Sequence, residues 1–412
     1  MTRVKVNVLP RPYEVLIESG LLDRAGAHLR ELLGDRKRVF VVTVSPVRRR
    51  WGKSLARSLA AAGFAPEFVE MRDGERYKRL ATVEALAEKM TRLGAERDAV
   101  VLAFGGGVVG DVGGMLASVY MRGVELVQIP TTVQAQVDAS VGGKTGVNLG
   151  AGKNLVGTFY QPMAVLIDPA VLATLPEREF RAGLYESLKA GVIGLPELFR
   201  VLEKTPIQTL RRDQKMLEWV IAESVKLKAQ VVSADEREVG LRRVLNFGHT
   251  IGHALESATR YRDFLHGEAV AWGMIAATQI AFAMERIDGA SARRIADAVR
   301  SLGPLPAVAT RSQRVIDGLR SDKKTRQGVV HFVLPREIGR VEIVNDVPGS
   351  VLRAAVDELR RASRRPYPRA HPSHRSAGVT EVASRIVPRR DASLGRASAM
   401  AWRKREAGCE RS

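Results

Sequence analysis

Residues 99–114 read AVVLAFGGGVVGDVGG, an apolar run that leads directly into a glycine-rich segment. The run has the length and β-branched content of a buried strand, and the glycines open a helical pattern. Glycine lets the backbone approach a phosphate, and a helix N-terminus supplies unpaired N–H groups and the positive end of the dipole. Gly105, Gly107 and Gly110 have the Gly-x-Gly-x-x-Gly spacing, but the additional glycines make the match unclean. The stretch therefore indicates either a dinucleotide pyrophosphate site or a tight turn that needs glycine for packing.

Asp111 lies inside this stretch and would repel a phosphate. We therefore expect it to hold a ribose hydroxyl or a backbone donor. Around the stretch, short β-branched runs alternate with helical patterns up to about residue 176. Strands are expected at 38–43, 67–71 and 99–104, and helices at 51–62 and 82–93. This alternation predicts a parallel sheet in an α/β layer.

The chain turns helical after about residue 177. Apolar residues recur with a period of 3.6 over 217–229 and 268–284, and strand signals are few. We therefore expect a Rossmann-like α/β nucleotide-binding domain at 1–176 and an all-α domain at 177–360.

The excess of basic residues is concentrated near the C-terminus. The formal net charge is +20, and residues 361–412 carry about nine of these charges in a segment dominated by Arg, Ser, Pro and Ala. Low hydrophobicity with high net charge predicts a disordered tail. The remaining excess, about +11, suits a protein with an anionic ligand. No aromatic-interleaved patch or nucleic-acid module accompanies the tail, so we do not expect it to bind nucleic acid.

The sequence points away from membranes and oxidising compartments. Cys409 is the single cysteine, so no disulfide can form within the chain. Residues 1–20 alternate polar and apolar side chains and lack the apolar core of a secretory signal. No run approaches the roughly 18 apolar residues of a membrane helix. We expect a soluble, cytoplasmic protein with no membrane partner.

Three of the seven histidines fall within 249–266. His249 and His253 are four residues apart, so they share one helix face, and His266 precedes a long apolar run where another helix would start. Two imidazoles that converge with a third, joined by a carboxylate, would make a zinc site with an open position. The alternative is a set of ordinary core or surface histidines, which the third histidine and the surrounding glycines disfavour.

Lysines in glycine-rich segments form a second polar group. Lys144 lies within 142–146 and Lys153 within 152–154. The Gly-Lys-Thr is not a P-loop, because the first glycine of that motif would fall on Asp138. An ammonium beside a permissive backbone suits a phosphate or carboxylate, although solvated surface lysines fit the pattern equally well.

A carboxylate to join the histidines is found upstream. Glu186 and Lys189 lie three residues apart in a helical pattern with glycines at both ends. From spacing alone a surface ion pair is the simpler interpretation, and other acidic residues compete as the ligand. The residues by themselves therefore lead to an α/β nucleotide domain, a helical domain with a candidate metal site, and many basic anchors.

These pieces together resemble the 3-dehydroquinate synthases, a family of sugar phosphate cyclases. The resemblance runs in order from about residue 10 to 345, and the segment after about 360 has no counterpart. The motifs that carry it are Asp73-Gly74-Glu75 with Lys78, Gly105 to Asp111, Tyr120 to Gly123, Pro130-Thr131-Thr132, Gln136 to Asp138, Ser140 to Thr145, Gly152 to Asn154, Ala182-Gly183 through Glu186 to Lys189, Lys228-Ala229, Asp235-Glu236, Arg242 through Asn246 to His253, His266 to Glu268, and Asp322 to Lys324.

The resemblance implies that one NAD and one divalent metal, zinc or cobalt, bind between the two domains of a homodimer. It assigns the metal to Glu186, His249 and His266, and moves His253 from the metal to a catalytic hydrogen bond. The other catalytic positions it implies are Lys144, Lys189, Lys228, Arg242 and Asn246. Further substrate contacts are Lys153, Asn154, Lys324 (with Lys323 adjacent) and, from the partner subunit, Arg122. The NAD contacts are Glu75, Lys78, Gly106, Gly107, Asp111, Thr131, Thr132, Asp138, Lys144 and Lys153.

The implied reaction converts 3-deoxy-D-arabino-heptulosonate 7-phosphate (DAHP) to 3-dehydroquinate and phosphate, in the shikimate pathway. It proceeds by transient oxidation by NAD, β-elimination of phosphate, re-reduction and intramolecular aldol closure. The small anionic substrate, a sugar acid phosphate, explains the excess of lysine and arginine. One alternative is another sugar phosphate cyclase, or a polyol dehydrogenase such as a glycerol dehydrogenase, which would release NADH stoichiometrically. Another is a non-catalytic protein whose tail binds nucleic acid.

One position departs from the family pattern. The family often has Asp or Asn after the first strand of the nucleotide domain, where it holds the adenosine ribose, and here the residue is Val44. Loss of one hydrogen bond weakens NAD binding by about 0.5–1.5 kcal/mol, unless Ser45 substitutes. We predict that Val44→Asp binds NAD more tightly than the wild type in a fluorescence titration. Equal or weaker binding by the variant would count against this assignment.

Overall fold

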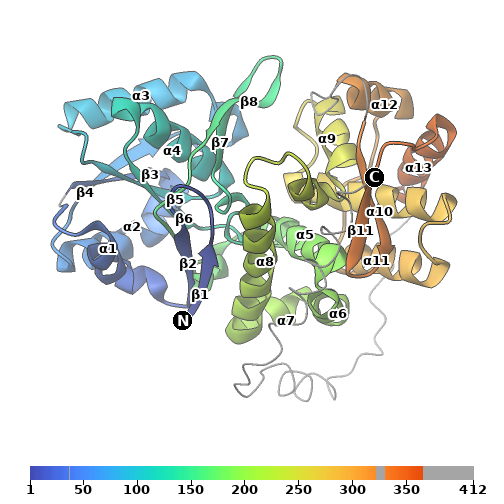
Figure 1. The fold of residues 1–412 in the computed structure, drawn as a ribbon, viewed down its shortest axis with the longest axis horizontal. Helices are drawn as coiled ribbons and strands as arrows, with labels where there is room; N and C mark the ends of the chain where they lie inside the picture. Colours follow the sequence, from blue (N-terminus) through green and yellow to red (C-terminus); the bar gives the residue numbers. More distant parts are fainter. Residues whose placement is uncertain (37, 322–329, 365–412) are drawn as a thin grey trace, which may run out of the picture. The chain divides into compact units, whose positions relative to one another are not determined.

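The computed structural model of the chain describes residues 1–36, 38–321 and 330–364 (Figure 1). Lys323, Lys324 and most of the expected tail lie outside these residues, so the assignments made to them stay predictions. Within the described ranges, no helix is both long and apolar enough to cross a membrane.

A seven-stranded sheet organises the first part of the chain, coloured blue to green in Figure 1. Its order is β1-β2-β9-β6-β5-β3-β4, and neighbouring strands are parallel except for the antiparallel pair β1 and β2. The expected parallel sheet is thus confirmed. The bounds are β1 Thr2–Val6, β2 Tyr13–Ile17, β3 Arg38–Val44, β4 Ala65–Met71, β5 Val100–Gly105, β6 Glu125–Pro130 and β9 Ala164–Ile167.

The central strands are buried on both faces, which accounts for their uninterrupted apolar sequences. All six residues of β5 are buried, and so are six of the seven residues of β3. Helices α3 and α4 contribute to the same core, in which Leu86 and Leu116 pack with strand residues such as Val101. The helices of this part are α1 Ala25–Leu33, α2 Ser45–Ala61, α3 Leu80–Arg92 and α4 Gly107–Val119.

Helix α2 begins six residues before the expected position, at Ser45 rather than at residue 51. The expected start relied on apolar periodicity, which the run Arg48–Arg50 interrupts. Pro46 lies in the first turn, where its fixed φ favours the helix and its missing N–H is not needed. The proline therefore moves the start of the helix to the end of β3.

The motifs that are expected to bind a nucleotide meet at one edge of the sheet. The chain runs from β3 to β4 on one side and returns to β5 on the other, and open α/β sheets bind ligands at such a reversal. Helix α4 starts directly after β5, with Gly106 as its N-cap. The N–H of Thr131, at the end of β6, donates to the carbonyl of Gly105 at 2.9 Å. This arrangement brings Gly106, Gly107, Thr131 and Thr132 together.

The glycines of this stretch have different surroundings. A Cβ at Gly114 would lie 2.5 Å from Cγ2 of Thr145, so this glycine permits close packing of α4 on β7. Gly106 and Gly107 instead form the start of α4, where the expected pyrophosphate site stays a prediction. The hairpin that α4 packs against is made by β7 Lys144–Leu149 and β8 Gly152–Phe159.

The second part of the chain is mainly helical, as expected. Helix α10 is buried over most of its length and packs against α5, α9, α11 and α13. One antiparallel hairpin adds to the expected all-α part, formed by β10 Phe332–Glu337 and β11 Arg340–Val344. The helices are α5 Glu177–Gly194, α6 Pro196–Lys204, α7 Ile207–Arg212, α8 Gln214–Ala234, α9 His249–Ala258, α10 His266–Ala283, α11 Gly289–Ser301, α12 Ser312–Ser321 and α13 Gly349–Ala362.

Helix α13 continues past the expected start of the tail. It includes Arg361 and ends at Ala362, because its face carrying Val356 and Leu359 is buried. The start of the tail assigned to Arg361 is therefore too early. The rest of that segment, from residue 365, lies outside the described residues.

Candidate metal and nucleotide site

Glu186 on α5 and two histidines at helix starts converge on one point. Oε1 of Glu186 lies 3.7 Å from Nε2 of His249 and 3.6 Å from Nε2 of His266. The Nδ1 atoms lie near acceptors, 3.2 Å from the carbonyl oxygen of Phe247 for His249 and 3.1 Å from Oε2 of Glu256 for His266. Each Nδ1 is therefore assigned the proton, which leaves the Nε2 lone pairs facing Glu186.

Close helix packing brings these side chains together. A Cβ at Gly267 would lie 1.8 Å from the carbonyl oxygen of Ala182, so α10 touches α5 directly beside His266. A Cβ at Gly273 would lie 1.8 Å from the carbonyl oxygen of Gly248, which brings α10 against the start of α9 beside His249. Neither position has room for any larger residue. The glycines around the histidines thus set the spacing of three helices.

The donor set fits a divalent metal. The side chain of Glu186 is 1% exposed, and its Oε1 accepts no hydrogen bond from the described residues. Lys189 Nζ lies 2.5 Å from the other oxygen, Oε2. A buried carboxylate oxygen without a donor is costly, and a cation between it and the two Nε2 atoms would satisfy it. One carboxylate and two imidazoles suit zinc or cobalt with positions left open.

His253 lies one turn after His249 on α9. Its ring centroid is 5.3 Å from that of His249 and 5.7 Å from that of His266. The three histidines can place nitrogens within 4.8 Å of one another, so the set of three histidines is also geometrically possible. Because Oε1 of Glu186 has no hydrogen-bond donor among the described residues, we favour Glu186, His249 and His266 as the metal ligands. His253 then lies next to the metal site without being a ligand.

Glu256 is a site residue that the sequence reasoning missed. Its side chain is 2% exposed, with Oε2 facing His266 and Oε1 lying 3.1 Å from Nζ of Lys153. Burial opposes its charge, but His266 and Lys153 outweigh burial and hold the pKa of Glu256 well below its usual range. Burial likewise opposes a charge on His266, yet Glu256 raises the pKa of that ring. The spacing of His249, His253 and Glu256 on one helix face could have revealed it.

Lys228 on α8, which is buried, and the partly buried Asp138 form an ion pair with Nζ 2.7 Å from Oδ1. Asp138 lies in a π-helical turn, Ala135–Ala139, a conformation common at functional sites. Burial lowers the pKa of Lys228 to about 8, although Asp138 opposes the shift. Burial would raise the pKa of Asp138, but Lys228 and Lys189 outweigh it and hold that pKa well below its usual range.

Arg242, Asn246 and Lys144 also lie together, as expected. Arg242 Nη2 donates to the carbonyl of Gly142 at 3.0 Å, and Lys144 forms an ion pair with Glu238. Asn246 Nδ2 donates to the other oxygen of Glu238 at 2.7 Å. Glu238, which has a φ of 58°, was not singled out by any sequence motif and joins two of the expected site residues.

The expected nucleotide-binding residues form a connected polar group. Lys78 is buried and pairs with Asp111 and with Oδ1 of Asn154. Asp111 therefore has a lysine as its partner rather than the backbone donor considered above. Glu75 accepts a hydrogen bond from Asn148 at 2.8 Å and lies 3.5 Å from Lys153 Nζ. Lys153 thus lies between Glu75, an expected nucleotide contact, and Glu256, which faces the candidate metal ligand His266.

Comparison with known proteins decides the family. Residues 68–182 match the family model described as 3-dehydroquinate synthase N-terminal, and residues 183–325 match the C-terminal one. The 3-dehydroquinate synthase of Koribacter versatilis is 54% identical over 88% of this chain and 99% of its own length. That of Solibacter usitatus is 48% identical over 83% of this chain and 95% of its own. The chain belongs to the 3-dehydroquinate synthase family.

Solved structures agree with this membership. A 2-epi-5-epi-valiolone synthase from Streptomyces hygroscopicus, with NAD+ and Zn2+ bound, is 33% identical with a TM-score of 0.78 and covers 86% of this chain and 98% of its own. A 2-deoxy-scyllo-inosose synthase complexed with carbaglucose-6-phosphate, NAD+ and Co2+ is 26% identical with the same TM-score, 0.78, over 87% of this chain and 99% of its own. A probable glycerol dehydrogenase from Sinorhizobium meliloti (19% identity, TM-score 0.56) shares the fold alone.

Two positions that the family resemblance singles out lie outside these networks. Arg122, an expected substrate contact, follows α4 in a tight turn with a φ of 69°, and its side chain forms no hydrogen bond or ion pair within the described part of the chain. Val44 is 5% exposed at the end of β3. The hydroxyl of the adjacent Ser45 already accepts a hydrogen bond from Arg49 at 2.8 Å, which weakens its claim as a substitute for the missing carboxylate.

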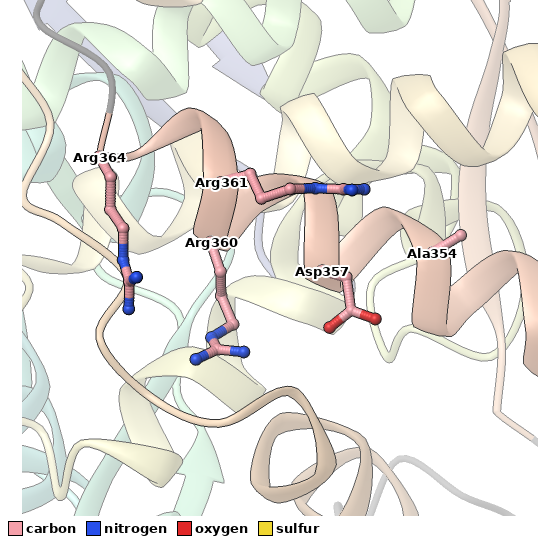
Figure 2. A pocket seen from close by; sticks show the side chains of 5 residues that line it. All are labelled: Ala354, Asp357, Arg360, Arg361 and Arg364. Carbon is pink, nitrogen blue, oxygen red and sulfur yellow. The ribbon is translucent and has the colours of Figure 1, made fainter.

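A separate surface hollow of about 460 Å³ lies along α13 (Figure 2). It is lined by Ala354, Asp357, Arg360, Arg361 and Arg364. Asp357 accepts a hydrogen bond from Ser312, which ties α13 to α12. None of the lining residues matches a motif of the family, so this basic hollow is not part of the candidate site.

Proposed function

We propose that this chain is a 3-dehydroquinate synthase, a phosphate-eliminating carbon–oxygen lyase that depends on NAD and a divalent metal. It converts DAHP to 3-dehydroquinate and phosphate in the shikimate pathway. The observation that carries the proposal is the 54% identity to a synthase matched over 99% of its length. The converging Glu186, His249 and His266 support it with a donor set that suits zinc or cobalt.

The residues of the chain would mainly bind and orient the substrate. Glu186, His249 and His266 would hold the metal, which would polarise the hydroxyl oxygen on the carbon to be oxidised, and bound NAD would supply reversible hydride transfer at that carbon. In the ligand-free protein Glu238 holds Lys144 and Asn246, so an incoming carboxylate or phosphate would take the place of Glu238 on these side chains. Lys228 and Arg242 supply further positive charge, and His253 offers a ring nitrogen for a hydrogen bond to the substrate.

A homodimer would complete the site. Met121 and Arg122 both have positive φ values, and Met121 is 43% exposed, so this turn presents side chains outward. We propose that Arg122 reaches the substrate of the partner subunit. The cytoplasm is the proposed location. The proposed domains are 1–176 and 177–362, with the boundary immediately before α5 and the second domain ending with α13.

Another sugar phosphate cyclase activity is the second candidate. Its support is the 33% identity and TM-score of 0.78 to a 2-epi-5-epi-valiolone synthase. The substrate distinguishes the two, because DAHP carries a carboxylate that other sugar phosphates lack. Release of phosphate from a sugar phosphate without a carboxylate but not from DAHP would favour the second candidate.

A phosphate-release assay with DAHP tests the main proposal. We expect turnover that needs both metal and NAD, is abolished by a chelator, and yields no stoichiometric NADH because the hydride returns to the intermediate. Glu186→Gln should lower turnover by about 100-fold or more, since it removes the charged ligand. No phosphate release by the wild type with metal and NAD present would contradict the proposal.

The pH dependence of kcat/KM is expected to follow the charge of Lys228. Because burial lowers its pKa to about 8, Lys228 is charged below this pH and loses its charge as the pH rises through it. We expect kcat/KM for DAHP, which reports the free enzyme, to fall above pH 8 by up to about tenfold per unit.

Two substitutions separate this effect from a general loss of charge. Lys228→Arg keeps the charge at high pH and should remove the fall. Lys153→Arg is the matched control and should retain it, because Glu256 and Glu75 outweigh burial and raise the pKa of Lys153. A fall at pH 8 that persists in Lys228→Arg would show that another group is responsible.

A further inference from the structure

We propose that Glu256 is a positioning residue that orients His266 toward the metal and joins this ligand to Lys153 of the β7–β8 hairpin. The inference rests on the metal centre of the proposed function and extends it to a residue outside the ligand set. Neither the sequence motifs nor the family resemblance assigns a role to Glu256.

Glu256 holds His266 along the axis of its ring. Oε2 of Glu256 lies 3.1 Å from Nδ1, while Nε2 on the opposite side of the ring lies 3.6 Å from Oε1 of Glu186. The carboxylate is 2% exposed, so water does not weaken this interaction strongly. A carboxylate that accepts from Nδ1–H fixes the tautomer, sets the ring orientation and makes Nε2 a better electron donor.

The two candidate histidine ligands have different hydrogen-bond acceptors at Nδ1. Nδ1 of His249 faces the neutral backbone carbonyl of Phe247 at 3.2 Å, whereas Nδ1 of His266 faces a charged carboxylate. Hydrogen bonds to charged groups are roughly twice as strong as neutral ones. His266 therefore depends on one side chain for its orientation, and a single substitution at Glu256 removes that support without touching Glu186 or His249.

The second oxygen of Glu256 connects the metal ligand His266 to the β7–β8 hairpin. Oε1 lies 3.1 Å from Nζ of Lys153, whose ammonium is also 3.5 Å from Glu75 and 4.5 Å from the ring centroid of Tyr261. Lys153 lies on β8, 103 residues from Glu256 in the sequence. Each carboxylate oxygen thus has its own partner, and loss of the charge would loosen both.

Metal affinity measures the proposed role without turnover. Metal-free protein is titrated with Zn2+ and with Co2+ in competition with a chromophoric chelator. We expect Glu256→Gln to weaken binding of both ions by about 10- to 100-fold, the usual effect of removing a carboxylate behind a histidine ligand. Glu75→Gln is the matched control, because it removes a negative charge beside Lys153 but leaves His266 untouched. Its metal affinity should stay within about twofold of the wild type.

Equal metal affinities of Glu256→Gln and Glu75→Gln would overturn the proposal. A second measurement uses the wild type, in case Glu256→Gln does not fold. In the zinc-loaded protein, nitrogen NMR of the imidazole of His266, identified by its loss in His266→Asn, should show a protonated Nδ1 and a metal-bound Nε2. A metal-bound Nδ1 or a protonated Nε2 would overturn it. Failure of DAHP turnover with these metal affinities intact would instead count against the proposed function alone.

Discussion

A buried carboxylate oxygen facing two imidazole nitrogens is the constraint on which the site depends. Oε1 of Glu186 is within 3.7 Å of both Nε2 atoms and accepts no hydrogen bond from the described residues. Such a group is stable only when a proton or a cation occupies the space between the three atoms. The contacts of α10 with α5 and α9 at Gly267 and Gly273 hold the three side chains in this arrangement. The packing of the three helices therefore positions the ligands for a metal ion before it binds.

The basic residues of the site are less available than the net charge suggests. The lysines at positions 78, 144, 153, 189 and 228 each pair with a carboxylate, on Asp111, Glu238, Glu256, Glu186 and Asp138 respectively. At Lys78, Lys189 and Lys228, which are buried, the pairs offset the cost of burying an ammonium. They also mean that an anionic substrate must compete with acidic side chains of the protein. Substrate binding would then exchange these carboxylates for the anionic groups of the substrate. Glu238, which pairs with Lys144 and Asn246, is the carboxylate we expect the substrate to displace first.

Much of the fold was predictable because its signals are local. The apolar run of β5 and the glycines after it identify the strand, the turn and the helix start without knowledge of the rest of the chain. The predicted start of α2 was wrong because the helix begins at Ser45, with Pro46 in its first turn, before the apolar periodicity on which the prediction relied. The hairpin β10–β11 was missed because its short strands show little alternation between buried and exposed residues.

The site was predictable in part. Spacing identified the histidines but left their carboxylate open, and the family resemblance supplied Glu186. Glu238 was missed because its partner Lys144 is 94 residues away in the sequence, and no local pattern indicates such a contact. Glu256 shares a helix face with His249 and His253, which is a local signal, but its contact with Lys153, 103 residues away, has none.

X-ray absorption at the zinc edge tests the central claim most directly. Protein loaded with one equivalent of zinc should show two imidazole nitrogens and one carboxylate oxygen at about 2.0–2.2 Å, with the remaining positions filled by water or ligand oxygens. Multiple scattering counts the imidazoles. Three imidazoles would place His253 on the metal and contradict the assignment of Glu186, His249 and His266 as the ligands.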